Sequence, residues 1–424
     1  MNVLSERSVA FLCKYSWIYD FKVTNILSDG ILANIPYEWR RFLSQLTIQD
    51  FNDIFFDSDI AYTSIPDHVS EFIKDLKSLY LPRKVVSLSQ SSLSNSQKKK
   101  IGLKKEHEIV NFAAFIDKTC DLRGVTNVVD IGSGLGYLGE ELSRKGYNLI
   151  GIEGSESHTK RADRRKETHE SHNFKTINMV IDDSSDSLCE LSSIVPENSC
   201  LVGLHCCGDL TPHLINIFAQ LEKIQSLMIV SCCYHKMAST SKGFRNFPLS
   251  EKLKFLVSNS NNPDAFNGFM LRLGAQETVK RWISMEQKEH GSHMKSMGFR
   301  AILQEVAVSN NINLVKKKRR IKQSDFEHIN SFLNCISKQY DIDEANAKIL
   351  TEKVAESYQL NSKLFDLFEL LTGLQFLVQS VIENLIHMDR VLYLNEKLKV
   401  SECDIVEVFD EVISPRNKVI CASR

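Results

Sequence analysis

An apolar run that leads into closely spaced glycines is the strongest local pattern in the chain. Residues Val128 to Ile131 are mostly apolar, and Gly132, Gly134 and Gly136 follow at alternate positions. A helical pattern of apolar and charged residues then runs from Leu138 to Lys145. This order predicts a buried strand, a tight turn and the start of a helix. Glycines let the backbone approach a ligand closely, and the free N–H groups of a first helical turn favour polar or negative ligand groups.

Apolar runs and helical patterns continue to alternate toward the C-terminus. They predict further strands over residues 147–152, 175–181, 199–205, 226–231, 406–409 and 418–422. Leucine and phenylalanine recur at helical spacing over residues 362–397, which predicts a long helix that packs on a sheet face. Strands that alternate with helices in this way predict an α/β fold built on an open, mostly parallel sheet.

The glycine spacing distinguishes between two nucleotide-containing ligands. A dinucleotide fingerprint has glycine at its first, third and sixth positions, and the sixth position from Gly132 is Tyr137, whose ring would crowd a pyrophosphate. A compact Gly-x-Gly-x-Gly with an aspartate two residues ahead, here Asp130, is typical of S-adenosylmethionine-dependent methyltransferases. The spacing therefore favours S-adenosyl-L-methionine over NAD as the ligand, and a fold that has lost its ligand stays open as a further alternative.

Acidic residues after the second and third strands complete the predicted donor site. Glu153 follows the second strand, where a carboxylate can accept hydrogen bonds from both ribose hydroxyls. Asp183 follows the third strand, where an acidic side chain can bind the adenine amino group. We therefore predict donor binding by Asp130, Gly132, Gly134, Gly136, Glu153 and Asp183.

Histidines, cysteines and an aspartate follow the fourth and fifth strands, whose ends should be neighbours in a parallel sheet. These residues are His205, Cys207, Asp209, Cys232, Cys233 and His235. One interpretation is catalytic, with His205 or His235 as a general base and Asp209 as an orienting group. A second is a zinc site, but the cysteines lack the Cys-x-x-Cys spacing of structural sites, so no metal ligand is assigned. A third is that the thiols only pack and shape the pocket.

The remaining sequence predicts three regions. We expect a helical N-terminal lobe over residues 1–83, a serine-rich linker over 84–100, and a methyltransferase domain over 101–424. A helical insertion of that domain is expected at about 238–358 and can shape the choice of substrate. The many aromatic residues of the N-terminal lobe can serve substrate recognition or can simply be buried packing.

Composition limits the partners and the compartment. The 424 residues carry a net charge of −1, which argues against binding nucleic acid through bulk charge and leaves only local basic patches. The chain has no run of about 18 apolar residues and no signal-peptide core, so we expect no membrane partner. Its 11 cysteines lack the spacing of a disulfide framework. These features favour a reducing compartment, cytoplasmic or nuclear.

Several motifs together resemble one known family. They are Asp-Ile-Gly-Ser-Gly-Leu-Gly from Asp130, Leu-His-Cys-Cys-Gly-Asp-Leu-Thr from Leu204, Ser-Cys-Cys-Tyr-His-Lys-Met from Ser231, Lys-Lys-x-His-Glu from Lys104, and Phe-Asp-Glu-Val-Ile-Ser-Pro-Arg-Asn from Phe409. The chain resembles the methyltransferase-like protein 25 family over about residues 100–424. That family includes proteins named for a ribosomal RNA adenine dimethylase domain. The resemblance implies a class I S-adenosylmethionine methyltransferase with a Rossmann-like, seven-stranded sheet, whose final strand runs antiparallel beside the fifth.

The motif after the fourth strand bears on the acceptor. Adenine amino methyltransferases have an Asn/Asp-Pro-Pro-aromatic motif there, whereas this chain has the sequence His-Cys-Cys-Gly from His205 to Gly208. The His-x-Cys-Gly and Cys-Cys-x-His motifs are also similar to those of tRNA 2′-O-methyltransferases that modify position four of the acceptor stem. A hydroxyl acceptor would need a base, which His205, Asp209 or His235 can supply.

Together these patterns predict an enzyme that transfers a methyl group from S-adenosyl-L-methionine to a macromolecular acceptor, either RNA or protein. The alternative is a non-catalytic binding or scaffold protein that keeps the methyltransferase fold. The sequence leaves the oligomeric state open.

Overall fold

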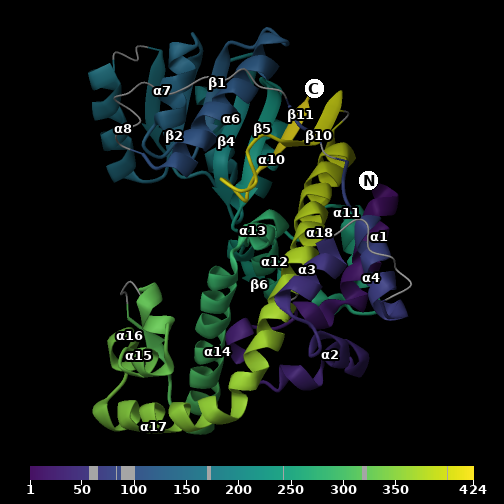
Figure 1. Ribbon diagram of the computed structural model, residues 1–424. Helices are drawn as coiled ribbons and strands as arrows, with labels where there is room; N and C mark the ends of the chain where they lie inside the picture. The colour runs from purple at the N-terminus through teal and green to yellow at the C-terminus, as the bar shows by residue number, and fades with distance from the viewer. Residues whose placement is uncertain are drawn as a thin grey trace. The chain divides into compact units, whose positions relative to one another are not determined.

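The computed structural model describes residues 1–56, 65–82, 84–86, 101–169, 173–241, 243–317, 322–398 and 400–424. They form two compact units (Figure 1). One unit contains residues Met1–Ala10, Tyr80–Gln276 and Val381–Arg424, and the other contains Phe11–Leu79 and Glu277–Ser380. The expected linker lies outside the described residues except for 84–86, of which Val85 forms a β-bridge with Glu407.

A seven-stranded sheet organises the first unit. Its strands lie side by side in the order β10, β11, β5, β4, β1, β2, β3 (Figure 1). Strands β1 to β5 are parallel, and β11 runs antiparallel to both β5 and β10. The bounds are β1 Asn127–Ile131, β2 Asn148–Glu153, β3 Phe174–Asn178, β4 Ser199–Cys207, β5 Ile224–Cys232, β10 Glu402–Glu407 and β11 Lys418–Ser423. This topology confirms the predicted α/β, Rossmann-like fold.

Two strands, β3 and β10, differ from their predicted ranges by three or more residues at one end, and the others differ by one or two. Strand β3 ends at Asn178 rather than at residue 181, so Asp183 lies in the segment that leads to the next helix and not directly at the strand end. Strand β10 covers 402–407 rather than 406–409, although Val408 and Phe409 beyond it are buried. Burial of apolar side chains continues past the end of each assigned strand here, and an apolar pattern reports only the burial.

Helices cover both faces of the sheet because the strands carry apolar residues on both sides. Along β1, Val128 packs in a core with Phe112 of α6 and Leu142 of α7. Its neighbour Val129 points to the opposite face and packs in a core with Phe218 of α10 and with Leu394 of α18, the helix Phe365–Lys397. Helices assigned wholly to this unit are α6 Leu103–Asp121, α7 Tyr137–Arg144, α8 Glu156–His169, α9 Ser185–Ile194, α10 Leu210–Gln220, α11 Glu251–Ser258 and α12 Gly268–Gly274.

The segment after β5 begins with a short hairpin of β6 Ser239–Thr240 and β7 Gly243–Phe244. The start of α11 is then fixed to α18, which spans Phe365–Lys397. The buried carboxylate of Asp389 accepts hydrogen bonds from the backbone N–H groups of Leu249 and Ser250 at 2.8 and 2.9 Å. Its charge is therefore used to hold this segment in place.

The second unit is helical and has an aromatic core. It draws on two segments that are far apart in the sequence. Trp39, Phe51, Phe72, Trp282 and Phe299 are all buried, and the Trp282 indole donates a 2.8 Å hydrogen bond to Asn52. Its helices are α2 Tyr37–Leu43, α3 Ile48–Phe56, α4 Asp67–Lys77, α13 Val279–Ser284, α14 Gln287–Ser309, α15 Ile329–Leu333, α16 Ile336–Gln339 and α17 Glu344–Asn361, and a small β8–β9 pair joins Val315–Lys316 to Tyr340–Asp341. Helices α1, Asn2–Lys14, and α18 run from one unit into the other.

One helical stretch is long and apolar enough to meet a length-and-hydropathy criterion for a membrane span. It covers Glu344–Lys397, and 83% of its most apolar window is buried inside the protein. Burial of this kind is what the core helix of a folded domain shows.

Candidate functional site

The glycine loop after β1 has a backbone that other residues would strain. Gly132, Gly134 and Gly136 have φ values of +73°, +58° and +76°, in the left-handed region that favours glycine. The N–H groups of Gly132 and Ser133 donate to the carbonyl of Ile152 at 2.8 and 3.1 Å, which fixes the loop to the end of β2. A Cβ atom on Gly136 would lie 2.9 Å from the ring of Phe174, so a side chain at this position would not fit.

The carboxyl groups of Asp130 and Glu153 lie close to this loop. Glu153 accepts hydrogen bonds from the N–H groups of Gly134 and Ser155, each at 2.9 Å. Asp130 is buried on β1, and burial, with a smaller effect from the charge of Glu153, raises its pKa to about 8. Asp130 is therefore protonated near neutral pH unless a cation lies next to it.

A cavity of about 450 Å³ opens at the C-terminal ends of β1 and β4. This size falls within the range of small-molecule sites. Its lining includes Lys105 and Glu108 of α6, Asp130, Gly132 and Gly134 at the end of β1 and in the loop, Tyr137 of α7 and His205 of β4. The position agrees with the rule that ligands of open α/β sheets bind outside the carboxyl ends of the strands.

Three of the six predicted donor-binding residues, Asp130, Gly132 and Gly134, line this cavity. Gly136 caps the start of α7, and Glu153 reaches the loop through Gly134. Asp183 is exposed and forms a 2.8 Å ion pair with Arg245, and it is not among the lining residues. The donor-binding role of each of these residues stays a prediction.

His205 reaches the cavity because β4 is irregular near its end. The register with β5 shifts between Gly203 and Cys206, and His205 has a φ of +64°. A Cβ atom on Gly203 would overlap the sulfur of Cys206, so this close approach needs glycine. An irregularity of this kind re-aims a side chain, and here it places the imidazole in the cavity wall.

The imidazole of His205 is paired with a buried carboxylate. Its Nε2 lies 3.0 Å from Oε2 of Glu108, which is only 3% exposed. Ser414 donates a 2.6 Å hydrogen bond to the other oxygen. Burial alone would raise the pKa of Glu108, but the hydrogen bonds and charge of His205, together with Ser414, hold that pKa below its ordinary value. The pair is therefore an oriented imidazole and an ionised carboxylate.

The other two predicted catalytic residues lie outside the cavity lining. Both oxygens of Asp209 are engaged, because they accept hydrogen bonds from the Ala238 N–H and the Asn246 amide, each at 2.7 Å. His235 is half-buried, and burial, followed by the charges of Arg272 and Lys236, lowers its pKa. Asp209 thus holds the segment after β5, and the catalytic roles of Asp209 and His235 stay predictions.

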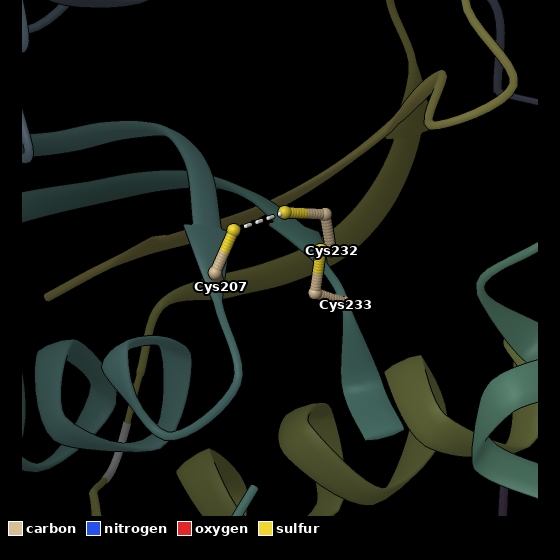
Figure 2. A group of neighbouring side chains, drawn as sticks. All are labelled: Cys207, Cys232 and Cys233. Atoms are coloured by element: carbon tan, nitrogen blue, oxygen red, sulfur yellow. Dashed lines mark hydrogen bonds between the residues drawn. The ribbon is translucent and has the colours of Figure 1, made fainter. Parts of the chain in front are cut away.

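The cysteines that were expected near this site form a separate cluster. The sulfurs of Cys207, Cys232 and Cys233 lie within 4.8 Å of one another, at the ends of β4 and β5 (Figure 2). The hydrogen bond from Cys232 lowers the pKa of Cys207 to about 6, although burial acts against this shift. None of these three residues lines the 450 Å³ cavity.

Glu108 ends the motif that starts at Lys104, but the sequence analysis assigned it no role at the site. It sits on the buried face of α6, four residues before Phe112, so the available signal was a charged residue at an apolar position. Lys105 and His107 lie on the same helix and have different surroundings. Lys105 lines the cavity and lies 4.2 Å from the ring of Tyr137, whereas His107 accepts a 2.9 Å hydrogen bond from the Asp410 N–H.

Comparisons with known proteins agree with this architecture. A family model described as "Methyltransferase domain" matches residues 104–240. The "Probable methyltransferase-like protein 25" of Homo sapiens is 26% identical over 278 residues, which are 64% of this chain and 44% of that protein. The protein of the same name from Mus musculus is 27% identical over 241 residues, 53% of this chain and 37% of that protein. The chain thus spans less than half the length of the curated relatives that it matches.

Two solved structures illustrate a resemblance to part of the chain. The bacterial CtHen1-CN methyltransferase domain covers 28% of this chain and 64% of its own, at 12% identity and a TM-score of 0.23. WbdD covers 46% of this chain and 40% of its own, at 14% identity and a TM-score of 0.26. Scores this low carry no argument about the site.

The range matched by the methyltransferase domain, residues 104–240, contains the glycine loop and the motifs after β4 and β5. These matches support the resemblance of the chain to the methyltransferase-like protein 25 family.

Proposed function

We propose that the protein is an S-adenosylmethionine-dependent methyltransferase that transfers a methyl group to a macromolecular acceptor, RNA or protein. One observation carries the proposal: a single cavity of about 450 Å³ is lined by a glycine loop, the buried Asp130 and the Glu108–His205 pair. A donor site and a proton acceptor therefore meet at one place.

The residues of the cavity fit the proposed donor. The loop has no side chains at Gly132 and Gly134, so its backbone can lie directly against a ligand. Lys105 offers a cation for the carboxylate of an amino acid, and Asp130 offers a carboxyl group that ionises next to a positive charge. To accept hydrogen bonds from the ribose hydroxyls, Glu153 would give up the hydrogen bond that it accepts from the Gly134 N–H. S-adenosyl-L-methionine, when bound, supplies an electrophilic methyl group on a sulfonium.

The Glu108–His205 pair supplies the proton transfer. A nitrogen or oxygen acceptor must lose a proton as it becomes methylated, and the imidazole of His205 in the cavity wall is placed to accept that proton. Glu108 orients the ring through the 3.0 Å contact and stabilises the imidazolium that forms. His205 is thus the proposed base, and Glu108 is a positioning residue.

The test is transfer of labelled methyl groups from S-adenosyl-L-methionine to the RNA and protein of an extract from cells that lack this protein. We expect His205→Ala to lower kcat by roughly 100- to 10,000-fold, the usual contribution of a general base. Glu108→Gln should lower kcat by about tenfold or more, because it weakens the orientation of the ring. Donor affinity, measured by calorimetry, should change little in both variants.

The matched control is His328→Ala, which removes an exposed histidine in the other compact unit and should keep full activity. Full turnover by His205→Ala would refute the catalytic assignment. Donor binding by the unchanged protein without any methyl transfer would instead indicate a binding protein that keeps the fold.

A further inference from the structure

Three thiols from two neighbouring strands converge at the C-terminal edge of the sheet. Cys207 ends β4, Cys232 ends β5, and the two residues are partners in the parallel register. Their sulfurs are 3.1 Å apart, and all three sulfurs, including that of Cys233, lie within 4.8 Å of one another (Figure 2). The cluster therefore joins residues that are 25 positions apart in the chain.

The backbone takes an uncommon conformation that gathers these side chains. Consecutive residues of a strand point to opposite faces, so Cys232 and Cys233 would normally diverge. Cys233 has φ +50° and ψ +44°, in the left-handed region, and this turn lets both sulfurs lie near Cys207. A residue with a Cβ atom is strained in that conformation, because the Cβ atom comes too close to the following carbonyl oxygen. Strain of this kind is often found at ligand sites.

Gly208 helps to hold the two strand ends together. Its φ is +56°, and a Cβ atom there would lie 2.8 Å from the backbone carbonyl oxygen of Lys236. The loop after Cys207 and the segment after Cys233 can therefore approach each other only because residue 208 has no side chain. The closeness of the three thiols follows from this backbone packing and does not depend on side-chain rotamers alone.

We propose that Cys207, Cys232 and Cys233 bind a zinc ion as thiolates. A tetrahedral zinc lies about 2.3 Å from each sulfur, which places the sulfurs about 3.8 Å apart. The observed separations, 3.1 Å for one pair and up to 4.8 Å for the group, bracket this value. Soft thiolate ligands select zinc over magnesium or calcium, and each thiol releases its proton as it binds.

The proposed site has three protein ligands and an open fourth position. Within the part of the chain that the structure describes, no further histidine, cysteine, aspartate or glutamate atom joins the group. Cys207 is exposed, so water can reach the metal from its side. Three ligands with an open position are typical of catalytic zinc sites, whereas structural sites are closed by four.

Chain spacing alone argued against a metal, because neither cysteine pair has the Cys-x-x-Cys form. The Cys-x-x-Cys spacing applies to ligands that one tight turn of the backbone holds together. Here the strand register supplies the geometry instead, since it places residue 207 beside residue 232. The proposal does not depend on the donor site or on the assignment of His205.

The test is the metal content of the full-length protein, purified with a reductant and without added chelator. We expect about one zinc ion per chain by inductively coupled plasma mass spectrometry. Cys207→Ser, Cys232→Ser and Cys233→Ser should each lose most of it. Cys189→Ser is the control, because Cys189 is an exposed thiol on α9, outside the cluster, and its variant should keep the zinc.

Cys232 is buried, so its variant could lose zinc because it fails to fold. A second measurement separates loss of the metal site from loss of the fold. The unchanged protein, stripped of metal and loaded with Co²⁺, should show a thiolate-to-cobalt charge-transfer band. Cys207→Ser should reduce that band while its circular dichroism stays unchanged, because Cys207 is exposed. The proposal is wrong if the unchanged protein holds neither zinc nor cobalt, if all three variants keep their metal, or if Cys207 and Cys232 form a disulfide under the reducing purification.

Discussion

Glu108 connects three segments through its two carboxylate oxygens. One oxygen lies 3.0 Å from His205 on β4, and the other accepts a 2.6 Å hydrogen bond from Ser414 near the last strand. A buried carboxylate is stable only with such partners. Local patterns could place Glu108 on a helix. Its partners, however, lie much later in the chain, 97 positions (205 − 108) and 306 positions (414 − 108) after it. Only the folded sheet shows that it lies beside His205.

Asp130 leads to a prediction about pH. Burial raises its pKa from the ordinary value of 3.8 to about 8. Between these values the folded protein holds a proton that the unfolded chain has lost, so the stability of the fold decreases as pH rises. The decrease is at most about 1.4 kcal/mol per pH unit. We expect the Tm of Asp130→Asn to rise relative to that of the unchanged protein between about pH 5 and about pH 8.

The control for this experiment is Asp186→Asn, which changes an exposed aspartate on α9. Its Tm difference from the unchanged protein should stay constant over the same range. A pH-independent difference for Asp130→Asn would mean that Asp130 is ionised in the folded protein throughout.

At the scale of elements, the apolar pattern predicted the strands of the sheet well. Strands that are buried on both faces read as continuous apolar runs, so Val128 to Ile131 and the segments that became β4 and β5 were recognisable. Their order also placed the cysteines of β4 and β5 near each other, because parallel strands end at one edge. The apolar pattern could not predict the left-handed backbone conformations of His205 and Cys233, because they depend on contacts made after folding.

Helix α14 provides a matched pair of glycines for a test of packing. Gly291 faces open space, whereas a Cβ atom on Gly298 would overlap the ring of Phe365. We expect Gly291→Ala to stabilise the protein by about 0.5–1 kcal/mol through its higher helix propensity. Gly298→Ala should destabilise it by about 1–3 kcal/mol, the usual cost of overpacking. Denaturant unfolding measures both changes, and equal effects of the two substitutions would contradict the described packing.

At the scale of the whole molecule, the two compact units were not predictable from local patterns. The second unit combines residues 11–79 with 277–380, so its aromatic core unites an N-terminal segment with the insertion after β5. The sequence indicated helices in both segments, but neither segment carries a local signal for its partner. Long-range packing of this kind depends on shape, which hydrophobic periodicity does not encode.

Helix α18 contributes to both units and illustrates why composition alone is a weak guide. It is apolar enough to meet a membrane criterion, yet it carries buried charges that are paired within the protein. Glu369 lies 2.8 Å from His290, and Glu383 lies 2.6 Å from Arg416. Although burial alone would raise the pKa of Glu383, the charges of Arg416 and Lys418 lower it to about 2. Buried, paired charges of this kind are typical of a helix in the core of a folded domain.

The central claim is that the cavity at the ends of β1 and β4 binds S-adenosyl-L-methionine, and calorimetric titration of the full-length protein tests it most directly. The account predicts saturable binding to about one site per chain, weakened about tenfold or more by Gly134→Ala because φ there is +58°. Gly291→Ala, remote from the loop in sequence and in the other unit, should bind as the unchanged protein does. An absence of saturable binding by the unchanged protein would contradict the account.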